Sequence, residues 1–209
     1  MSGLCCWQVT RLPVGMIKIL EDDISVFEYN MQDSEVPINE KTKGINRSLR
    51  NSKNVWIPTE HWISGWLWYY ISKVNRENFL YNITDIDNGQ IQYTHYSEGD
   101  YYHWHQDGDI NSFYSPSQIV SSSTNVYNDY VMLNGEYVRK LSFTLQLSEE
   151  SDYEGGDVQF LDNSGGTFFA PKQRGTLIVF DSRVRHRVRK IKSGVRKSLV
   201  GWIVGPRWN

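Results

Sequence analysis

A period-two alternation of apolar and polar residues constrains the fold of this chain more than any other feature. The stretch "KLSFTLQLS", residues 140–148, places an apolar side chain at every second position: Leu141, Phe143, Leu145 and Leu147. Successive side chains of a β-strand point to opposite faces, so the stretch predicts a strand with one apolar and one polar face.

Further strand-like stretches precede and follow this one, separated by Gly-containing turns: "QIQYTHYSEG" (90–99), "DYYHWHQD" (100–107), "EGGDVQFLD" (154–162), "GTFFAPKQ" (166–173), "GTLIVFDS" (175–182), "VRHRVRKI" (184–191) and "RKSLVGWIV" (196–204). Many short strands at close spacing are typical of an all-β sandwich or barrel. The sequence has no internal repeat and no Pro/Gly-rich linker. We therefore expect residues 1–209 to form a single domain.

The first part of the chain, residues 1–88, is expected to supply N-terminal strands and one supporting helix to a core formed by residues 89–209. Residues 13–30 mix short apolar alternation with acidic residues and predict one or two strands, and the polar residues 31–54 predict a surface loop. Residues 59–78 predict an amphipathic helix. Its aromatic residues at helical spacing are expected to pack on a sheet: Trp62, Trp66 and Tyr70.

One long polar segment interrupts the strands of the core. Residues 108–137 are rich in Ser and Asn, with a turn signal at Asn134-Gly135. A loop of this length inside a compact domain is usually a lid or a binding loop, and the segment is expected to form one.

Composition excludes several classes of protein. Hydrophobic residues make up 39% of the chain and aromatic residues 14%, which is enough apolar surface for a packed core. The net charge of −2 gives no global attraction to nucleic acid or to an anionic membrane. No apolar run approaches the roughly 20 residues needed to cross a bilayer. The adjacent cysteines, Cys5 and Cys6, and the lack of a secretory signal fit a bacterial or viral cytoplasmic protein.

The stretch "YYHWHQDGD", residues 101–109, raises the possibility of a metal site. On a strand, residues i and i+2 share a face, so His105 and Asp107 are expected to project an imidazole and a carboxylate into the same space. These are two of the three protein ligands of a facial triad, which leaves open positions on Fe(II). An isolated His-x-Asp pair is weak evidence, and a third ligand is needed.

His186 is the candidate for the third ligand. In "DSRVRHRVRKI" it shares a face with Val184 and Val188, while the arginines on the other face can remain in water. An unpaired imidazole on a buried face costs on the order of 1–3 kcal/mol, so His186 needs a hydrogen-bond partner or a metal. Taken alone it would more often be a core histidine; together with the upstream pair it is expected to be a ligand.

Arg196 and Ser198 share one face of the next strand-like stretch. An inward Arg beside an inward hydroxyl would hold a carboxylate, because a guanidinium forms two parallel charge-assisted hydrogen bonds with that group. Such a carboxylate would belong to a cosubstrate of an iron site.

At this point "YSEGDYYHWHQD", "KLSFTLQLSEESDYEGGDVQF" and "PKQRGTLIVFDSRVRHRV…GVRKSLVGWIVGP" resemble the Fe(II)/2-oxoglutarate-dependent dioxygenases of the prolyl 4-hydroxylase-like branch, bacterial or viral in type. The resemblance covers residues 91–206. It implies a mainly β fold with flanking α-helices: a double-stranded β-helix, or jelly-roll, core of the cupin type. It also implies Fe(II), 2-oxoglutarate and O2, with ascorbate as an accessory reductant.

The resemblance assigns roles to individual residues. It implies that His105, Asp107 and His186 are the iron ligands and that Arg196 pairs with the C5 carboxylate of 2-oxoglutarate. Tyr102 matches a family tyrosine near the cosubstrate, and Gly155-Gly156 matches the turn into the next barrel strand. Asp107 argues for hydroxylation, since halogenating relatives lack this carboxylate.

Some positions are less clear from the motifs. Animal prolyl 4-hydroxylases usually have Lys at the position of Arg196, so Lys197 needs consideration, although strand parity favours Arg196. His103 shares the parity of His105, but the Tyr-x-x-His context favours His105 as the ligand. Trp104 should face away from the iron. Three further residues are expected, with Tyr102, to line the cosubstrate site: Ser198, Tyr93 and Thr144.

The resemblance implies oxidative decarboxylation of 2-oxoglutarate to succinate and CO2, coupled to hydroxylation of a C–H bond. The favoured substrate is a prolyl residue in a peptide or protein. A small molecule or free amino acid is the first alternative. Nucleic-acid demethylation, suggested by the basic tract 183–197, is less favoured, and a binding jelly roll without chemistry is opposed by the complete set of motifs.

Overall fold

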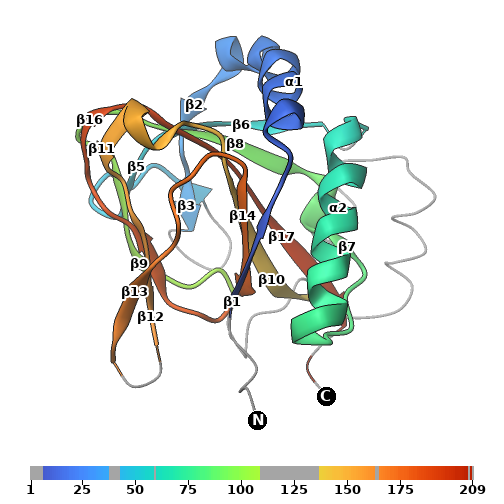
Figure 1. The fold of residues 1–209 in the computed structure, drawn as a ribbon. Helices are drawn as coiled ribbons and strands as arrows, with labels where there is room; N and C mark the ends of the chain where they lie inside the picture. The colour runs from blue at the N-terminus through green and yellow to red at the C-terminus, as the bar shows by residue number, and fades with distance from the viewer. Residues whose placement is uncertain are drawn as a thin grey trace.

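The computed structural model of this chain describes residues 7–37, 43–58, 60–108, 137–162, 165–206 and 208. Two antiparallel sheets face each other, and two helices cover the outer side of the larger sheet (Figure 1). This arrangement confirms the expected mainly β, jelly-roll fold. The segment expected to form a lid, residues 108–137, lies outside the described residues except at its two ends.

The long strands β10 and β17 lie near the middle of the major sheet. Along the sheet its order is β1 (Trp7–Arg11), β14 (Thr176–Asp181), β10 (Tyr137–Gln146), β17 (Arg196–Pro206), β8 (Ile91–Tyr96), β6 (Lys53–Ile57) and β2 (Gln32–Asp33), with β7 (Asp85–Ile86) also on β17. Every one of these pairings is antiparallel.

The minor sheet faces the polar side of the major sheet. Its order is β13 (Thr167–Phe169), β12 (Val158–Leu161), β15 (His186–Val188), β9 (Tyr101–His105) and β5 (Arg50–Asn51). Two short pairs complete the strands: β11 (Tyr153–Gly155) with β16 (Ile191–Gly194), and β3 (Val36–Pro37) with β4 (Lys43–Gly44).

The helices come from the first part of the chain. They are α1 (Val14–Ile24), continued by a 3-10 helix (Ser25–Asn30), and α2 (Trp62–Val74), continued by a π-helical turn (Asn75–Phe79). Short 3-10 turns span Asp87–Gly89 and Glu150–Asp152. No helix in the described ranges is long and apolar enough to span a membrane.

The expectation of strands over residues 13–30 is wrong, because the apolar residues there follow a helical period. Ile17, Leu20 and Ile24 are fully buried and lie three and four residues apart, so they form one stripe on α1. Residues 31–54 are also more ordered than a surface loop. They contribute β2 to β5 and the start of β6: β2 pairs with β6, β3 pairs with β4, and β5 pairs with the more distant β9.

The expected helix over 59–78 is present as α2 and its π-helical turn, and two of its three aromatic residues, Trp66 and Tyr70, pack half-buried against the core as expected. The buried stripe of the helix is aliphatic: Ile63, Leu67, Ile71 and Val74. Trp62 is 40% exposed, while the rings of Trp66 and Tyr70 continue from it along the helix with centroids 5.9 and 5.8 Å apart. The aliphatic stripe lets the helix lie close to the sheet, and the rings cover its flank.

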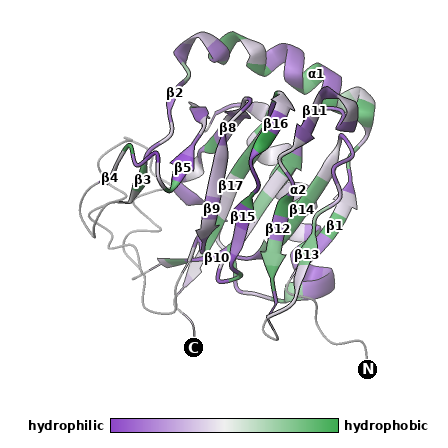
Figure 2. Cartoon of the chain, turned by 90° about the vertical axis from the view of Figure 1, so that its left-hand side faces the viewer, coloured by the Kyte–Doolittle hydropathy of each residue, from purple (hydrophilic) through white to green (hydrophobic). Residues whose placement is uncertain are grey.

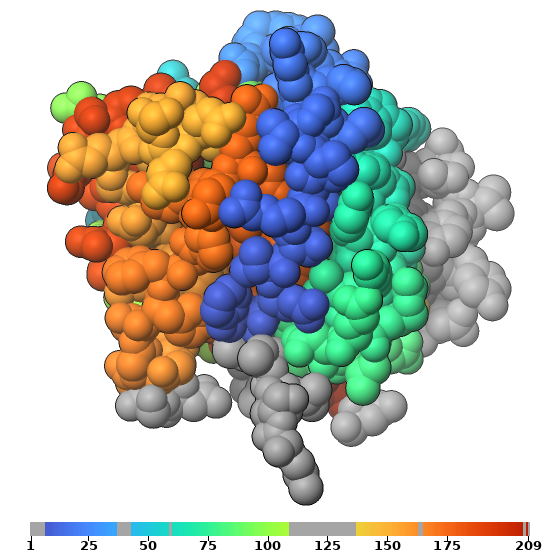
Figure 3. Space-filling model, viewed as in Figure 1, coloured from blue at the N-terminus to red at the C-terminus, as the bar shows by residue number. Residues whose placement is uncertain are grey.

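The alternation in β10 gives the major sheet two chemically different faces. The apolar face packs against α1 and α2, which close over it in the space-filling view (Figure 3). It includes Leu141, Phe143, Leu145, Leu177, Val179, Leu199 and Ile203. The opposite face points into the space between the sheets and carries buried polar residues: Gln92, Thr94, Ser142, Thr144, Gln146, Arg196 and Ser198. A polar interior of this kind is where a site can form.

Replacement of Leu67 by alanine should destabilise the fold strongly. Leu67 is fully buried between α2 and the major sheet, so Leu67→Ala leaves a cavity and should lower the free energy of unfolding by about 2–5 kcal/mol. Urea unfolding followed by circular dichroism measures it. Tyr69→Ala on the same helix is the control, because Tyr69 is 60% exposed and its loss should change stability by less than about 0.5 kcal/mol. Equal effects of the two changes would contradict the placement of α2.

Candidate metal centre

A β-bulge in β9 places two motif residues on the inner face of the minor sheet. His186 of β15 pairs with His105, and Val188 pairs with Tyr102, with a register shift between the two pairs. Between these two pairs, His103 and Trp104 of β9 lie opposite the single residue Arg187 of β15, which is a bulge of one extra residue. Tyr102 and His105 share a face although they are three residues apart, and their rings stack with centroids 3.5 Å apart.

The same bulge shows that the expected parity of His103 is wrong. His103 is exposed, and its ring lies beside that of Tyr101 with centroids 4.7 Å apart. Trp104 faces away from the centre, as expected, and the Arg187 guanidinium lies 4.7 Å from its ring centroid. His103 therefore does not compete with His105 as a ligand.

Asp107 reaches the centre from a backbone turn and not from strand alternation, because β9 ends at His105. The N–H groups of Asp107 and Gly108 both donate to the carbonyl oxygen of Ser182, at 3.0 and 2.9 Å. Gly108 fits closely there: a Cβ on it would lie 3.1 Å from both the Arg139 carbonyl oxygen and the Ser182 Cβ. The turn after β14 thus fixes where the carboxylate lies.

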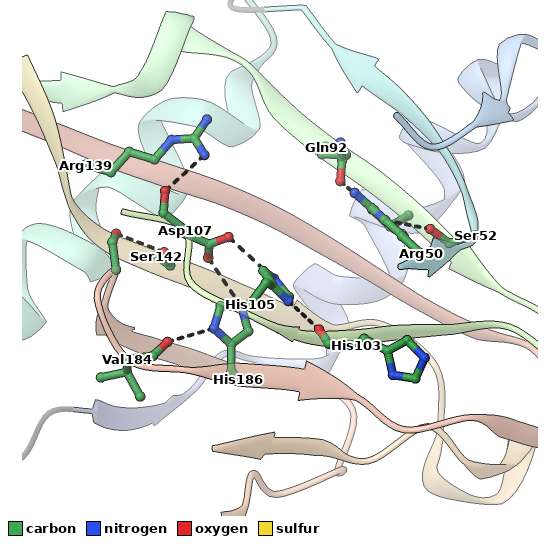
Figure 4. Close-up of polar contacts among 12 residues, drawn as sticks. Arg50, Ser52, Gln92, His103, His105, Asp107, Arg139, Ser142, Val184 and His186 are labelled. Atoms are coloured by element: carbon green, nitrogen blue, oxygen red, sulfur yellow. Dashed lines mark hydrogen bonds and ion pairs between the residues drawn. The ribbon is translucent and has the colours of Figure 1, made fainter. Parts of the chain in front are cut away.

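His105, Asp107 and His186 converge between the sheets (Figure 4). Nε2 of His105 lies 3.6 Å from one carboxylate oxygen of Asp107, and Nε2 of His186 lies 3.4 Å from the other. One ligand atom from each residue lies within 4.8 Å of the others. Their side chains are 12%, 8% and 9% exposed, so the structure brings the three predicted ligands together in a buried position.

Backbone carbonyl groups set the orientation of both imidazoles. Nδ1 of His105 lies 2.7 Å from the carbonyl oxygen of His103, and Nδ1 of His186 lies 3.0 Å from that of Val184. A carbonyl oxygen only accepts hydrogen bonds, so each Nδ1 carries a proton and donates it. In the neutral form of each ring, this bond leaves the lone pair on Nε2, which points towards the centre, as in many metal-binding histidines.

The charges at the centre are those of a cation site. Burial, reinforced by the neighbouring His186 imidazole, lowers the pKa of His105 to about 3, so this ring is neutral. Burial alone would raise the pKa of Asp107, but His186, His105 and the Arg139 guanidinium hold it below its ordinary value. Two lone pairs and a carboxylate that face each other repel unless a cation lies between them. Two histidines and one carboxylate are the donor set of the facial triad, so these residues fit Fe(II).

Arg196 is the second unusual group in the interior. The residue is 1% exposed, and its Nη1 donates to the Ser198 hydroxyl at 3.2 Å. Its Nε and Nη2 are buried and have no hydrogen-bond partner among the described residues. A buried guanidinium is costly without a counter-charge. The pocket around Arg196 therefore fits a carboxylate, such as one end of a dicarboxylate cosubstrate.

Aromatic residues and a glycine shape the space around Arg196. Tyr96 pairs with Arg196 across β8 and β17, and the guanidinium carbon lies 5.7 Å from the Tyr96 ring centroid. Burial raises the pKa of Tyr153, although the Arg196 guanidinium opposes the shift. Gly155 and Gly156 both have positive φ, and a Cβ at Gly156 would lie 3.3 Å from Arg196 Cδ. The same Cβ would lie 2.3 Å from Ile191 Cδ1, so the second glycine leaves room for the Ile191 side chain and for the aliphatic part of Arg196.

Three of the four other residues predicted to line the cosubstrate site lie in the interior. Thr144 and Ser198 lie on the inner face with Arg196, and the Thr144 hydroxyl is buried with no partner in the described parts of the chain. Burial raises the pKa of Tyr102, which keeps its hydroxyl protonated beside His105.

The expected cosubstrate contact of Tyr93 is wrong, because Tyr93 lies on the opposite face of β8. Its hydroxyl donates to Glu28 at 2.7 Å, on the side of the helices. Lys197 lies on the same side and pairs with Glu28 at 2.9 Å, so it does not replace Arg196. Thr94 and Tyr96, which pair with Ser198 and Arg196, are the β8 residues that face the interior. The register between β8 and β17 decides this, and no motif encodes it.

Arg50 is a functional candidate that the sequence did not indicate, because it lies in a polar stretch. It is 6% exposed, donates to Ser52 Oγ at 2.8 Å and to Gln92 Oε1 at 2.9 Å, and lies 4.9 Å from the Tyr102 ring centroid. Figure 4 shows it on the other side of His105 from Asp107. No described carboxylate forms an ion pair with it.

Comparison with known proteins agrees with this geometry. A family model described as the 2OG-Fe(II) oxygenase superfamily matches residues 91–204, which is more than half of the chain. A PKHD-type hydroxylase from Synechococcus sp. (strain CC9311) is 38% identical over 63 residues, covering 30% of this chain and 28% of that protein. A PKHD-type hydroxylase from Idiomarina loihiensis is 33% identical over 104 residues, covering 45% and 46%. The matches span less than half the length of these relatives.

Solved structures share the fold at low sequence identity. A prolyl-4-hydroxylase from Pseudomonas putida superposes with a TM-score of 0.65 at 18% identity, covering 96% of this chain and 92% of that one. A prolyl hydroxylase from Trichoplax adhaerens, in complex with a peptide fragment of the hypoxia inducible factor oxygen degradation domain, gives 0.67 at 16% identity, covering 94% and 82%.

Loss of one predicted ligand should abolish tight metal binding. Asp107→Ala and His186→Ala should each weaken Fe(II) binding by more than roughly 10–100-fold, the loss typical when a residue that hydrogen-bonds to a metal ligand is replaced. Anaerobic calorimetric titration measures the affinity. His103→Ala is the control, since His103 is the exposed histidine of the same strand and should bind Fe(II) like the unchanged chain. Equal loss in the control would contradict the assignment of the centre.

Removal of the Arg196 charge should weaken 2-oxoglutarate binding. Arg196→Leu leaves the distal carboxylate without its partner and should raise the dissociation constant by about 30-fold or more, the effect of losing a buried charge-assisted pair. Titration of the anaerobic Fe(II) form by visible absorption measures it. Lys197→Met, the adjacent residue on the opposite face, should bind 2-oxoglutarate normally. A chain that binds equally well with Arg196→Leu would contradict the pocket.

Proposed function

Because the chain belongs to the 2OG-Fe(II) oxygenase superfamily, we propose that it is an Fe(II)- and 2-oxoglutarate-dependent hydroxylase acting on a prolyl residue of a peptide or protein. The observation that carries this proposal is the pairing of two buried features. Three metal ligands with only acceptor atoms converge in the interior, and an unneutralised Arg196 lies on the sheet that faces them.

The residues of the chain divide the work between them. His105, Asp107 and His186 would hold the iron. The chemistry that iron and cosubstrate supply together is oxidative decarboxylation of 2-oxoglutarate to succinate and CO2, coupled to hydroxylation of a C–H bond by O2. The backbone carbonyls of His103 and Val184 hold the proton of each neutral imidazole on Nδ1, so that Nε2 is available to the metal.

The interior residues bind and orient the cosubstrate. Arg196 and Ser198 receive its distal carboxylate, and the unpartnered hydroxyl groups of Thr144 and Tyr153 offer further hydrogen bonds. The Tyr102 ring, stacked on His105, covers one side of the centre and helps to exclude water. Enclosure between the sheets strengthens each of these contacts, because they act in a medium of low dielectric constant.

A peptide substrate is supported by the kind of proteins that this chain resembles and by donors near the centre. The relatives named above are PKHD-type hydroxylases, and the similar structures are prolyl hydroxylases, one with a bound peptide. The Tyr102 ring lies between Arg50 and the metal ligand His105. The Arg50 guanidinium offers N–H donors that suit the carbonyl oxygens of an extended peptide.

Arg50 also supports a second candidate, hydroxylation of a free amino acid or another small carboxylic acid. Its guanidinium is buried, and its described partners are the uncharged Ser52 and Gln92. A buried cation of this kind would be neutralised by the carboxylate of a small substrate. In the first candidate Arg50 contacts a neutral peptide carbonyl group, and in the second it contacts a negatively charged carboxylate.

A substrate panel tests the proposal and separates the two candidates. The chain with Fe(II), 2-oxoglutarate and O2 is incubated with prolyl peptides blocked at both ends and, in parallel, with free proline and other small acids. Mass spectrometry should find a gain of one oxygen on the blocked peptides, with formation of an equal amount of succinate. Turnover of the free acids alone would favour the second candidate. Fe(II) and 2-oxoglutarate that give no charge-transfer absorption band would contradict both.

Arg50→Gln separates the two candidates in the same assay. The amide keeps N–H donors for a peptide carbonyl but loses the positive charge. For a peptide substrate, kcat/KM should fall modestly, by about one net hydrogen bond or roughly fivefold. For a free carboxylic acid, loss of the counter-charge should cost about 30-fold or more.

A further inference from the structure

The outer face of the minor sheet carries a basic hollow that the metal centre does not use. The hollow has a volume of about 420 Å³ and is lined by Tyr101, His103, Arg187, Val188, Arg189 and Lys190. These residues come from β9, from β15 and from the turn after it, the same segments whose inner face holds the iron ligands. Figure 2 shows this side of the molecule, with hydrophilic colouring on β9 and β15.

Positive charge on this face exceeds the negative charge beside it. Arg185 and Lys190 are exposed, and neither forms an ion pair with a carboxylate in the part of the chain that the structure describes. Arg187 donates through Nε to the uncharged Gln159. Arg189 lies 3.9 Å from Asp157, whose charge Lys172 shares at 3.8 Å. The chain as a whole has a net charge of −2, so this is a local concentration of positive charge.

Aromatic rings alternate with these cations. The Arg187 guanidinium lies 4.7 Å from the ring centroid of Trp104, and that of Arg189 lies 5.8 Å from the ring centroid of Phe169. Phe169 is 49% exposed on β13, and the Tyr101 ring lies beside His103 at the other end of the hollow. An open sheet face thus presents rings and positive charges in turn.

We propose that this basic aromatic face, made of Tyr101, His103, Trp104, Phe169, Arg185, Arg187, Arg189 and Lys190, binds single-stranded nucleic acid. The cations contact the phosphates, and bases stack on the rings. Proteins that bind single strands without sequence preference combine a positively charged groove with aromatic platforms in this way. The open sheet surface can hold an extended strand, whereas a duplex would keep its bases stacked inside and away from the rings.

The aromatic residues favour a nucleic acid over an acidic peptide. Carboxylates of a peptide would satisfy Arg185 and Lys190, but they would not stack on the exposed Phe169 ring. A base has such a planar face, and an arginine already packed on a ring adds a cation–π contact. This face is the outer face of the sheet whose inner face holds the metal ligands. A strand bound on it lies away from the metal, so the face would bind nucleic acid without demethylating a base.

Salt dependence of oligonucleotide binding tests the charges. Fluorescence anisotropy of labelled oligo-dT and oligo-U is measured with the full chain at several salt concentrations. Each phosphate contact contributes about −0.7 to the slope of log K against log salt for a single strand. Arg185→Glu with Lys190→Glu should reduce the steepness of that slope by about 1.4. The control is Lys18→Glu with Lys73→Glu, which changes the net charge equally on α1 and α2 and should leave the slope unchanged.

A second pair of variants tests stacking. Phe169→Ala should weaken binding at least about fivefold, the lower end of the effect of losing one base–aromatic stack, whereas Phe169→Tyr keeps the ring and should bind normally. His186→Ala should also bind normally, which separates this site from the metal centre and from the proposed hydroxylase. Circular dichroism confirms that each variant is folded.

Three results would overturn the proposal. The first is no oligonucleotide binding even at low salt. The second is equal loss in the control pair on α1 and α2, which would mean a general charge effect. The third is displacement of the oligonucleotide by polyglutamate of equal charge together with no effect of Phe169→Ala, which would identify a surface for acidic peptides.

Discussion

The pairing of His186 with His105 across β15 and β9 is the interaction on which the metal centre depends. Both imidazoles project from the same face of the minor sheet only in this register. A slip of β15 by one residue would turn His186 to solvent and bring an arginine to the inner face. The backbone carbonyls that hold each Nδ1 come from the same two segments, so the register sets the position and the proton state of both ligands together.

The major sheet can place buried polar residues opposite the metal ligands because its two faces differ in chemistry. Burial of the apolar face under α1 and α2 stabilises the fold, and this allows the inner face to carry Arg196, Thr144 and other buried polar groups. A buried donor without a partner costs about 1–3 kcal/mol, so Arg196 lowers the stability of the fold when no ligand is bound. An anion bound at Arg196 removes that cost, and its binding free energy adds to the stability of the fold.

The sequence predicted what depends on local spacing and missed what depends on register. The alternation in β10, the His105–Asp107 pair and the Arg196–Ser198 pair follow from residue types at short distances along the chain. His186 is far from the other two ligands in sequence and is assigned from its own motif, and the structure brings the three together. The side on which Tyr93 lies depends on how β8 pairs with β17, and the role of Arg50 depends on the pairing of β5 with β9. The prediction of strands over residues 13–30 is wrong for another reason. A short apolar stretch can fit both the helical and the strand period, and only its packing decides between them.

The bulge in β9 shows how one backbone irregularity can serve both faces of a sheet. In a regular strand, Tyr102 and Trp104 would share one face, and His103 and His105 the other. The extra residue breaks this alternation, so Tyr102 and His105 both face inward while His103 and Trp104 both face outward. The inner face gains a stacked tyrosine beside a metal ligand, and the outer face gains a tryptophan beside Arg187. In this chain, residues spaced Tyr-x-x-His share a face only because the bulge adds one residue between them, and the residues exposed on each side of the sheet follow from it.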